Sequence, residues 1–232
     1  MHPPVCVGGP IGANLAGVIV IFDLDGTVWD SAPGIIGSIE STFEWFGLPV
    51  PDRSVLSAHV GPPLQLMLAE LGIPVEHVDA ATLKYRERYV EWGVYEAALY
   101  PGITAVLDAL AASGIRLATA TSKGEGPTLQ MIDHFGLGDR FEIVGAASMD
   151  TSSVTKTAVL ERTLAQLGSP DPDECLMIGD RSYDVTGSAA FGIECVGVLW
   201  GYGSEDELRS AGARHIVGRP ADLAALVESL AS

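Results

Sequence analysis

The sequence has few basic residues. Lys and Arg together number 13 against 30 Asp and Glu in a chain of 232 residues, which gives a formal net charge of −17. Nucleic acids and anionic membranes bind proteins through basic patches, so this balance argues against both as partners. No run of about 18 apolar residues is present, and we expect no membrane-spanning helix. The same charge opposes an anionic substrate, unless a bound divalent cation reverses the field locally.

Cysteine is also scarce. The three cysteines, Cys6, Cys175 and Cys195, are widely spaced, and no Cys-x-x-Cys pair occurs. Cys175 and Cys195 lie in apolar runs, where a thiol behaves as a small hydrophobe. We therefore expect a reduced, cytoplasmic protein. Residues 1–17 contain several Gly and Pro and lack the basic start of a signal peptide, so we expect a flexible leader there.

Apolar residues, in contrast, make up 47% of the chain and fall into short runs. Compact apolar runs bounded by turn residues predict buried strands, and amphipathic segments of helical length predict helices between the later strands. The predicted strands are 18–23, 115–121, 141–146, 175–180 and 193–199, and the predicted helices are 103–112, 126–135, 154–167 and 184–191. This alternation predicts an α/β fold with a Rossmann-like parallel sheet as its core and helices on both faces.

One interval interrupts the alternation. Residues 31–100 contain helical patterns and no convincing strand, and about 70 residues are too many for a crossover connection. We therefore predict an all-helical cap subdomain at 31–100, inserted into a core made of 18–30 and 101–232. An insertion at this point would lie above the carboxyl ends of the strands, where open α/β sheets bind ligands. The helical patterns cover residues 35–46, 64–71 and 80–95.

Two aspartates follow the first predicted strand, in the segment Asp23-Leu24-Asp25-Gly26-Thr27. Residues two apart on a strand point the same way, so the two carboxylates share one face. Gly26 permits a tight turn that brings backbone N–H groups toward a bound anion. One ionised carboxylate can attack phosphorus while a protonated neighbour donates to the leaving oxygen. A pair of solvated loop aspartates is the alternative.

Further polar residues follow other predicted strands. Thr121, with Ser122 and Lys123 beyond it, can bind phosphoryl oxygens, although Thr and Ser are also ordinary turn residues. Lys156 lies in the first turn of a predicted helix, where it opposes the helix dipole. It is therefore either a partner for aspartates and phosphate or an exposed lysine.

The fourth predicted strand ends at Asp180, and Asp184 follows at the start of the next helix. Asp184 has a second explanation there as a capping carboxylate. Asp23, Asp25 and Asp180 together supply hard oxygen ligands and no soft or imidazole ligand. Such a set suits Mg²⁺, which binds a few carboxylates and keeps its other positions for water and phosphate.

In this order the four motifs resemble those of the haloacid dehalogenase-like (HAD) hydrolase superfamily. The family's D-x-D-x-T matches residues 23–27, its strand-ending Thr or Ser matches Thr121, and its G-D-x-x-x-D matches residues 179–184. Its basic residue at a helix start matches Lys156, although the proline that often follows is here Thr157. Three shorter segments resemble the phosphoglycolate-phosphatase-like branch: 61–64 (GPPL), 100–102 (YPG) and 200–203 (WGYG).

The resemblance implies a Mg²⁺-dependent phosphatase that hydrolyses a small-molecule phosphomonoester through an aspartyl phosphate. It assigns Asp23 as nucleophile and Asp25 as general acid, then base, with Thr121 and Lys156 on the phosphoryl oxygens. It implies Mg²⁺ held by Asp23, by the backbone carbonyl of Asp25 and by Asp180. Asp184 is expected to contact these ligands and not the ion itself. The residues expected around the phosphate are Gly26, Thr27, Thr121, Ser122, Lys123 and Lys156.

Several alternatives remain open at this point. A phosphomutase, transfer to a protein or other acceptor, and a phosphorylatable receiver-like signalling module also combine such residues. The carboxylate of Asp25 argues against a dehalogenase. Candidate substrates are 2-phosphoglycolate, a sugar phosphate and a nucleoside 5′-monophosphate, and we expect a monomer or weak homodimer. The residues of the cap that could select the substrate are Arg53, His59, Gln65, Lys84, Arg86 and Arg88.

Overall fold

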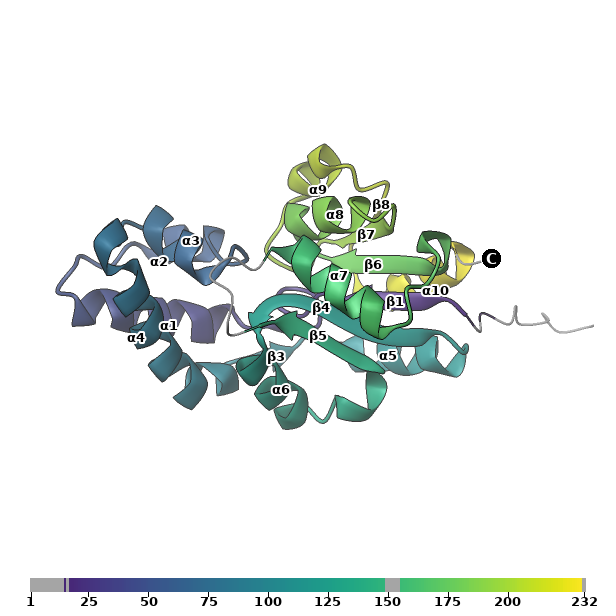
Figure 1. Cartoon of the computed structure of the whole chain (residues 1–232), viewed down its shortest axis with the longest axis horizontal. Helices are drawn as coiled ribbons and strands as arrows, with labels where there is room; N and C mark the ends of the chain where they lie inside the picture. Colours follow the sequence, from purple (N-terminus) through teal and green to yellow (C-terminus); the bar gives the residue numbers. More distant parts are fainter. Residues whose placement is uncertain (1–14, 16, 149–154, 231–232) are drawn as a thin grey trace, which may run out of the picture.

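The structure is a computed structural model that describes residues 15, 17–148 and 155–230. The expected leader, residues 1–17, lies outside the described residues except for Leu15 and Gly17. At the centre is a six-stranded sheet whose strands all pair in parallel, in the order β5-β4-β1-β6-β7-β8 (Figure 1). The strands are β1 (Ile19–Phe22), β4 (Arg116–Gly124), β5 (Ile143–Ala147), β6 (Cys175–Gly179), β7 (Glu194–Val198) and β8 (His215–Val217). The predicted α/β Rossmann-like core is confirmed.

Helices cover both faces of this sheet. Alternate residues of the central strand β1 point to opposite sides, so the strand has an apolar face on each side. Val20 and Phe22 pack in one apolar cluster and Ile19 and Ile21 in another. The first cluster receives side chains of α5 (Ile103–Ala112), α6 (Glu125–His134) and α10 (Pro220–Leu230). The second receives those of α7 (Lys156–Gln166), α8 (Ser182–Ala189) and α9 (Glu205–Ala211). All residues of β1 are buried, so the strand is anchored from both sides.

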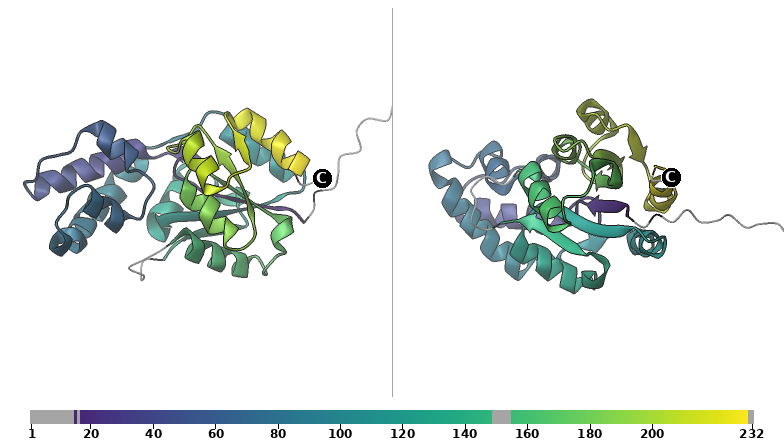
Figure 2. Two further views of the ribbon diagram at one scale, coloured as in Figure 1. Left: turned by 90° about the horizontal axis from the view of Figure 1, so that it is seen from above. Right: turned by 45° about the vertical axis from the view of Figure 1, so that its right-hand side comes forward.

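The helical insertion leaves the core just after β1 and lies at one end of the molecule (Figures 1 and 2). A short antiparallel pair, β2 (Trp29–Asp30) with β3 (Ala98–Leu99), forms its base. Between these strands lie α1 (Ala32–Trp45), α2 (Arg53–Ala58), α3 (Leu64–Glu70) and α4 (Val78–Glu91), with 3₁₀ turns at Val75–His77 and Gly93–Tyr95. The interval 31–100 is therefore helical apart from β3.

Some elements differ from the sequence prediction. Helix α2, strands β2, β3 and β8, and helices α9 and α10 were not predicted. The predicted helix 80–95 ends at Glu91 and is followed by a 3₁₀ turn. The other predicted elements are present, and their ends coincide with the prediction or differ from it by at most three residues. Among the described residues, no helix has the length and apolar character needed to cross a membrane.

Candidate active site

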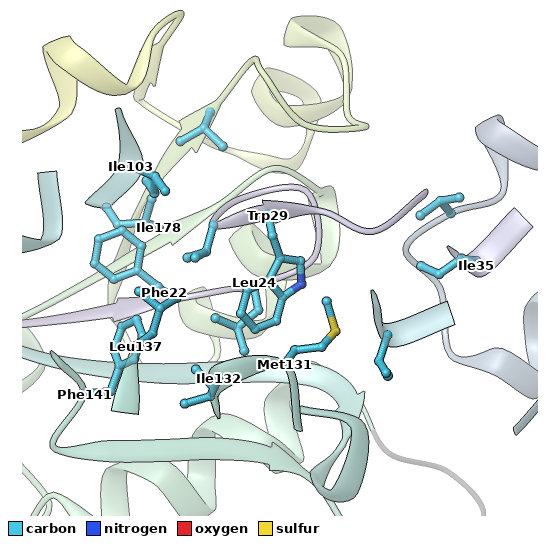
Figure 3. Close-up of a cluster of buried hydrophobic side chains, with 14 of the residues drawn as sticks. Phe22, Leu24, Trp29, Ile35, Ile103, Met131, Ile132, Leu137, Phe141 and Ile178 are labelled. Atoms are coloured by element: carbon cyan, nitrogen blue, oxygen red, sulfur yellow. The ribbon is translucent and has the colours of Figure 1, made fainter. Parts of the chain in front are cut away.

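The residues predicted to carry chemistry meet at the carboxyl ends of β1, β4 and β6, at the centre of the sheet. Asp23 directly follows β1, and its N–H donates to Ile178 O of β6 at 2.8 Å. Between the two aspartates, Leu24 is fully buried in the core together with Trp29 (Figure 3). Because Leu24 points into the core, the backbone positions Asp23 and Asp25 away from it, at the edge where β4 and β6 also end.

Lys156 pairs with two aspartates. Its Nζ donates to Asp23 Oδ1 at 2.6 Å and lies 2.8 Å from Asp184 Oδ1, and it also donates to Ala120 O at 2.9 Å. Lys156 is the first residue of α7, whose N-cap Thr155 accepts from the helix backbone. The side chain is buried, which excludes the exposed-lysine alternative.

Burial and this pairing shift the pKa values in opposite directions. Burial raises the pKa of Asp23 to about 7, Lys156 opposes the rise, and Asp184 adds to it. Burial alone would lower the pKa of Lys156, but Asp184 and Asp23 raise it above its usual value. Lys156 is therefore positively charged, and it compensates part of the negative charge of the two carboxylates.

Asp180 is a third buried carboxylate. Tyr202 N–H donates to its Oδ2 at 2.7 Å, and Thr27 Oγ1 donates to its Oδ1 at 3.3 Å. Burial, followed by the nearby charges of Asp184 and Asp23, raises its pKa well above the ordinary value. Gly26 has φ of +85°, and a Cβ there would lie 2.3 Å from Asp180 Oδ2, so only glycine fits this turn.

Asp23, Asp180 and Asp184 form a set of potential metal ligands. One carboxylate oxygen of each lies within 4.8 Å of the others, and all three residues are buried. If all three carboxylates are ionised, the single positive charge of Lys156 leaves net negative charge in a buried space, which a divalent cation would compensate. Three hard oxygen donors without sulfur or imidazole fit Mg²⁺. In this set, the carboxylate of Asp184 stands beside those of Asp23 and Asp180, whereas that of Asp25 does not take part.

Asp25 has different surroundings. Its Oδ1 accepts from Trp29 Nε1 at 2.8 Å and from Ser31 Oγ at 2.5 Å, and its Oδ2 accepts from Lys123 Nζ at 2.9 Å. Burial would raise the pKa of Asp25, but Lys123 and these hydrogen bonds together lower it. Lys123 Nζ also lies 4.5 Å from the ring centroid of Tyr89 on α4, so it contacts both the core and the insertion.

A cavity of about 190 Å³ opens between this cluster and the insertion. From the core it is lined by Asp23, Asp25, Thr121, Ser122, Lys123, Lys156 and Asp184. Thr121 is buried, and its Oγ1 accepts from Lys123 N–H at 3.2 Å. Gly26 and Thr27 do not line the cavity. The side chain of Thr27 donates to Asp180, so its contribution is to hold that carboxylate.

The six residues considered for substrate selection separate into two groups. Gln65 and Arg86 line the cavity. The cavity is not lined by the other four, Arg53, His59, Lys84 and Arg88. The three cations among them form ion pairs on the insertion, and His59 Nδ1 lies 2.8 Å from Val55 O. The ion-pair partners of the three cations are Glu40, Glu87 and Glu96, respectively.

Sequence reasoning missed several residues that position the site. Trp29 and Ser31 bind Asp25, and the Tyr202 hydroxyl accepts from Ser31 N–H at 2.8 Å. Arg181, which also lines the cavity, donates from Nε to Glu207 and from a terminal nitrogen to Val60 O on the insertion. The sequence contained a weak signal for two of these residues, because Arg181 lies inside the G-D-x-x-x-D motif and Tyr202 inside the WGYG segment.

Known proteins resemble this chain in sequence and in fold. The sequence profile described as haloacid dehalogenase-like hydrolase matches residues 20–198. The chain is 43% identical over 188 residues to the tyrosine-protein kinase PtkA of Mycobacterium tuberculosis, covering 81% of this chain but 64% of that protein. It is 36% identical to a 5′-nucleotidase of Pseudomonas aeruginosa, covering 92% and 95% of the two chains.

Solved structures give the same result. A predicted phosphatase from Clostridium acetobutylicum superposes with a TM-score of 0.86 at 35% identity, over 91% of this chain and 98% of the other. The structure of Mycobacterium tuberculosis PtkA superposes with a TM-score of 0.78 at 39% identity, over 91% and 97%. The profile match, the relatives and the fold agree: the chain belongs to the haloacid dehalogenase-like hydrolase family.

Proposed function

We propose that the protein is a Mg²⁺-dependent phosphatase that hydrolyses a small-molecule phosphomonoester through an aspartyl phosphate on Asp23. The observation that carries this proposal is the different pairing of two carboxylates two residues apart. Asp23 is held by Lys156 beside a possible metal site, and Asp25 is held separately by Lys123, Ser31 and Trp29. Different surroundings allow two neighbouring carboxylates different roles in one reaction. The raised pKa of Asp23 applies without a metal ion, and Mg²⁺ would keep its carboxylate ionised for attack.

In the first half-reaction Asp23 attacks phosphorus, and the bond from phosphorus to the ester oxygen breaks. Lys156 fixes the orientation of the Asp23 carboxylate before attack. Thr121, Ser122 and Lys123 line the cavity where the phosphoryl oxygens would lie, and their donors stabilise the charge on those oxygens. Asp23, Asp180 and Asp184 would hold Mg²⁺, which when bound neutralises charge on the transferring phosphoryl group.

Asp25 supplies and removes the proton. Its lowered pKa in the present arrangement depends on Lys123, which also lines the cavity that a phosphoryl group would enter. When Lys123 moves its hydrogen bond to a phosphoryl oxygen, the pKa of Asp25 rises and the carboxyl can donate to the leaving oxygen. The resulting carboxylate then takes a proton from the water that hydrolyses the aspartyl phosphate, and inorganic phosphate leaves.

The variant Asp25→Asn tests these roles, because it separates the two half-reactions. General acid–base catalysis contributes about 10²–10⁴-fold, so we expect a loss of this size in kcat on alkyl phosphates. With p-nitrophenyl phosphate the leaving group needs little protonation. The variant should therefore release a burst of nitrophenol equal to the enzyme concentration, then turn over slowly with phosphate retained on Asp23.

Rapid-mix kinetics and mass spectrometry of the quenched protein measure both quantities. Asp23→Asn is the matched control, and it should show neither burst nor turnover. Near-normal steady-state hydrolysis of alkyl phosphates by Asp25→Asn would remove its assigned role. A receiver-like module would react once with a phosphoryl donor and would not turn over in the wild type.

Phosphotransfer to a protein is a second candidate, favoured by the 43% identity to proteins named tyrosine-protein kinase. The same aspartyl phosphate would then be attacked by an acceptor hydroxyl instead of water. Incubation with ATP, Mg²⁺ and a tyrosine-containing peptide distinguishes the candidates: phosphopeptide formation supports transfer, and release of inorganic phosphate from phosphomonoesters supports hydrolysis. A phosphomutase would instead show phosphate moving between positions of one sugar phosphate.

Location and assembly remain proposals. Cys175 and Cys195 are free and buried, which agrees with the expected reducing, cytoplasmic surroundings, while Cys6 lies outside the described residues. A monomer or weak homodimer stays a prediction that sedimentation analysis would test.

A further inference from the structure

The part of the cavity formed by the insertion is mostly apolar. Its apolar lining comes from α1, α3, α4 and the loop before α3, and comprises Ile35, Val60, Pro62, Pro63, Leu64, Met67 and Val90. Three side chains of the insertion add polar groups that form no hydrogen bond or ion pair with the described residues: Gln65 on α3, and Tyr85 and Arg86 on α4. The hydroxyl of Tyr89, which also lines the cavity, donates to Met131 Sδ at 3.6 Å and is already used.

Arg86 differs from the other cations that line the cavity. Lys156 pairs with Asp23 and Asp184, Lys123 pairs with Asp25, and Arg181 pairs with Glu207. Arg86 is partly buried, and within the described ranges it has no carboxylate at ion-pair distance and no hydrogen-bond acceptor. In a chain of net charge −17, an unpaired arginine facing a cavity is available to an anion from outside the protein.

Tyr85, next to Arg86, provides a second observation. The residue is 7% exposed, and its ring stacks on Tyr89 with centroids 5.4 Å apart and planes at 9°. The residue lines the same cavity, and its hydroxyl has no hydrogen-bond partner in the part of the chain that the structure describes. The hydroxyl can therefore bind a ligand oxygen in the cavity.

We infer that Arg86 and the Tyr85 hydroxyl form a subsite for an anionic group, a carboxylate or a second phosphate, on the leaving part of the phosphomonoester. The inference rests on the proposed phosphatase function. A guanidinium binds either anion through two parallel N–H donors, with the tyrosine hydroxyl adding a third donor. A sugar or a nucleoside would bring several hydroxyls against the insertion's part of the lining, where the other uncommitted polar side chain among the described residues is Gln65.

Three probes with the same two-carbon chain test the inference in the presence of Mg²⁺. They are 2-phosphoglycolate, 1,2-ethanediol bisphosphate and 2-hydroxyethyl phosphate, which carry a carboxylate, a second phosphate and a neutral hydroxyl. Hydrogen bonds to charged groups are the stronger class, so we expect kcat/KM for at least one anionic probe to exceed that for the neutral probe by about 10- to 100-fold. The two anionic probes show which anion the subsite takes.

Arg86→Met retains the length and apolar stem of arginine and removes the charge. We expect the ratio of kcat/KM between the preferred anionic probe and the neutral probe to fall to within about threefold of one, with part of the ratio kept in Arg86→Lys. Lys84→Met, on the same helix but paired with Glu87 outside the cavity, should keep the wild-type ratio. Because the ratio compares two substrates on one preparation, a reduced folded fraction cancels.

Three results would overturn the inference. The first is a wild-type enzyme that hydrolyses the neutral probe as well as both anionic probes. The second is an unchanged ratio in Arg86→Met. The third is an equal loss on all three probes, which would place Arg86 on the transferred phosphoryl group instead. Failure of the phosphatase function itself is a different result, since the wild type would then hydrolyse neither these probes nor p-nitrophenyl phosphate.

Discussion

Removal of the metal should make the stability of this protein depend on pH through Asp23. In the absence of a metal ion the pKa of Asp23 is raised from 3.8 to about 7, first by burial and then by Asp184, against the opposing effect of Lys156. A carboxyl with a raised pKa in the folded state binds its proton more tightly there than in the unfolded chain. Its contribution to stability is therefore present below about pH 4 and is lost as the pH rises through about 7.

The size of this effect follows from the two pKa values. At 1.36 kcal/mol per pKa unit, ionising Asp23 in the metal-free folded state costs about 4 kcal/mol of unfolding free energy. About 3 kcal/mol of this is lost between pH 5 and pH 8, because the unfolded chain is already ionised at pH 5. For a chain of this length that corresponds to a fall in Tm of about 5–10 °C. Mg²⁺ binds the ionised carboxylate, so the stabilisation by Mg²⁺ should be much larger at pH 8 than at pH 5.

Thermal unfolding in EDTA and in Mg²⁺, across pH 5 to 8, measures both effects. Asp23→Asn is the matched variant, because the amide keeps an acceptor for Lys156 but does not titrate. Subtracting its pH dependence removes the contribution of the other acidic residues. We expect the variant to lose most of the metal-free pH dependence and most of the Mg²⁺ stabilisation. Equal pH slopes for the two proteins in EDTA, or Mg²⁺ stabilisation of the same size at all pH values, would refute the reasoning.

Three further perturbations have defined outcomes. Ca²⁺ should not replace Mg²⁺ in steady-state hydrolysis, because its looser coordination lets both oxygens of Asp23 bind the ion, and comparable turnover would contradict this. Lys123→Met should lower kcat/KM for p-nitrophenyl phosphate by about 10- to 100-fold through loss of a charged phosphate donor, and a change under threefold would count against that role. Arg181→Met should speed amide hydrogen exchange at Val60 and Gly61 by about tenfold, because the hydrogen bond to Val60 O is lost; unaltered exchange would show that this contact does not restrain the loop.

The central part of the fold was predictable because its strands are buried on both faces. Such strands read as continuous apolar runs, as in Ile19–Phe22 and Cys175–Gly179. The missed elements lack this signal. β8 has three residues, of which only Val217 is buried, and α9 buries only Leu208. β2 and β3 are two residues each and form through pairing across the insertion, which no local pattern shows.

The candidate site was predictable for a related reason. Parallel strands place their carboxyl ends at one edge, so Asp23, Thr121 and Asp180 had to meet there once the strands were assigned. The surroundings of Asp25 were not predictable in the same way. From the sequence alone, Trp29 is expected to be an apolar core residue. Its indole N–H donates to Asp25 because the chain turns back at Gly26. Tyr202, which holds Ser31, lies 171 residues further along the chain.

Substrate selection depends on a finer feature, the rotation of one helix. Lys84, Arg86 and Arg88 lie within five residues of α4, and composition does not distinguish them. At 3.6 residues per turn, Lys84 and Arg88 share a side of the helix, whereas Arg86 is turned about 200° away from each. Tyr85 and Tyr89 form a buried stripe between these two sides of the helix. Spacing could therefore separate Arg86 from the other two, but only the packing of α4 against α1 and α3 decides which side faces the cavity. The same packing pairs Lys84 and Arg88 with carboxylates of the insertion and leaves Arg86 beside the cavity. With the subsite inferred above, the choice of leaving group would be set by tertiary contacts far from Asp23 in sequence.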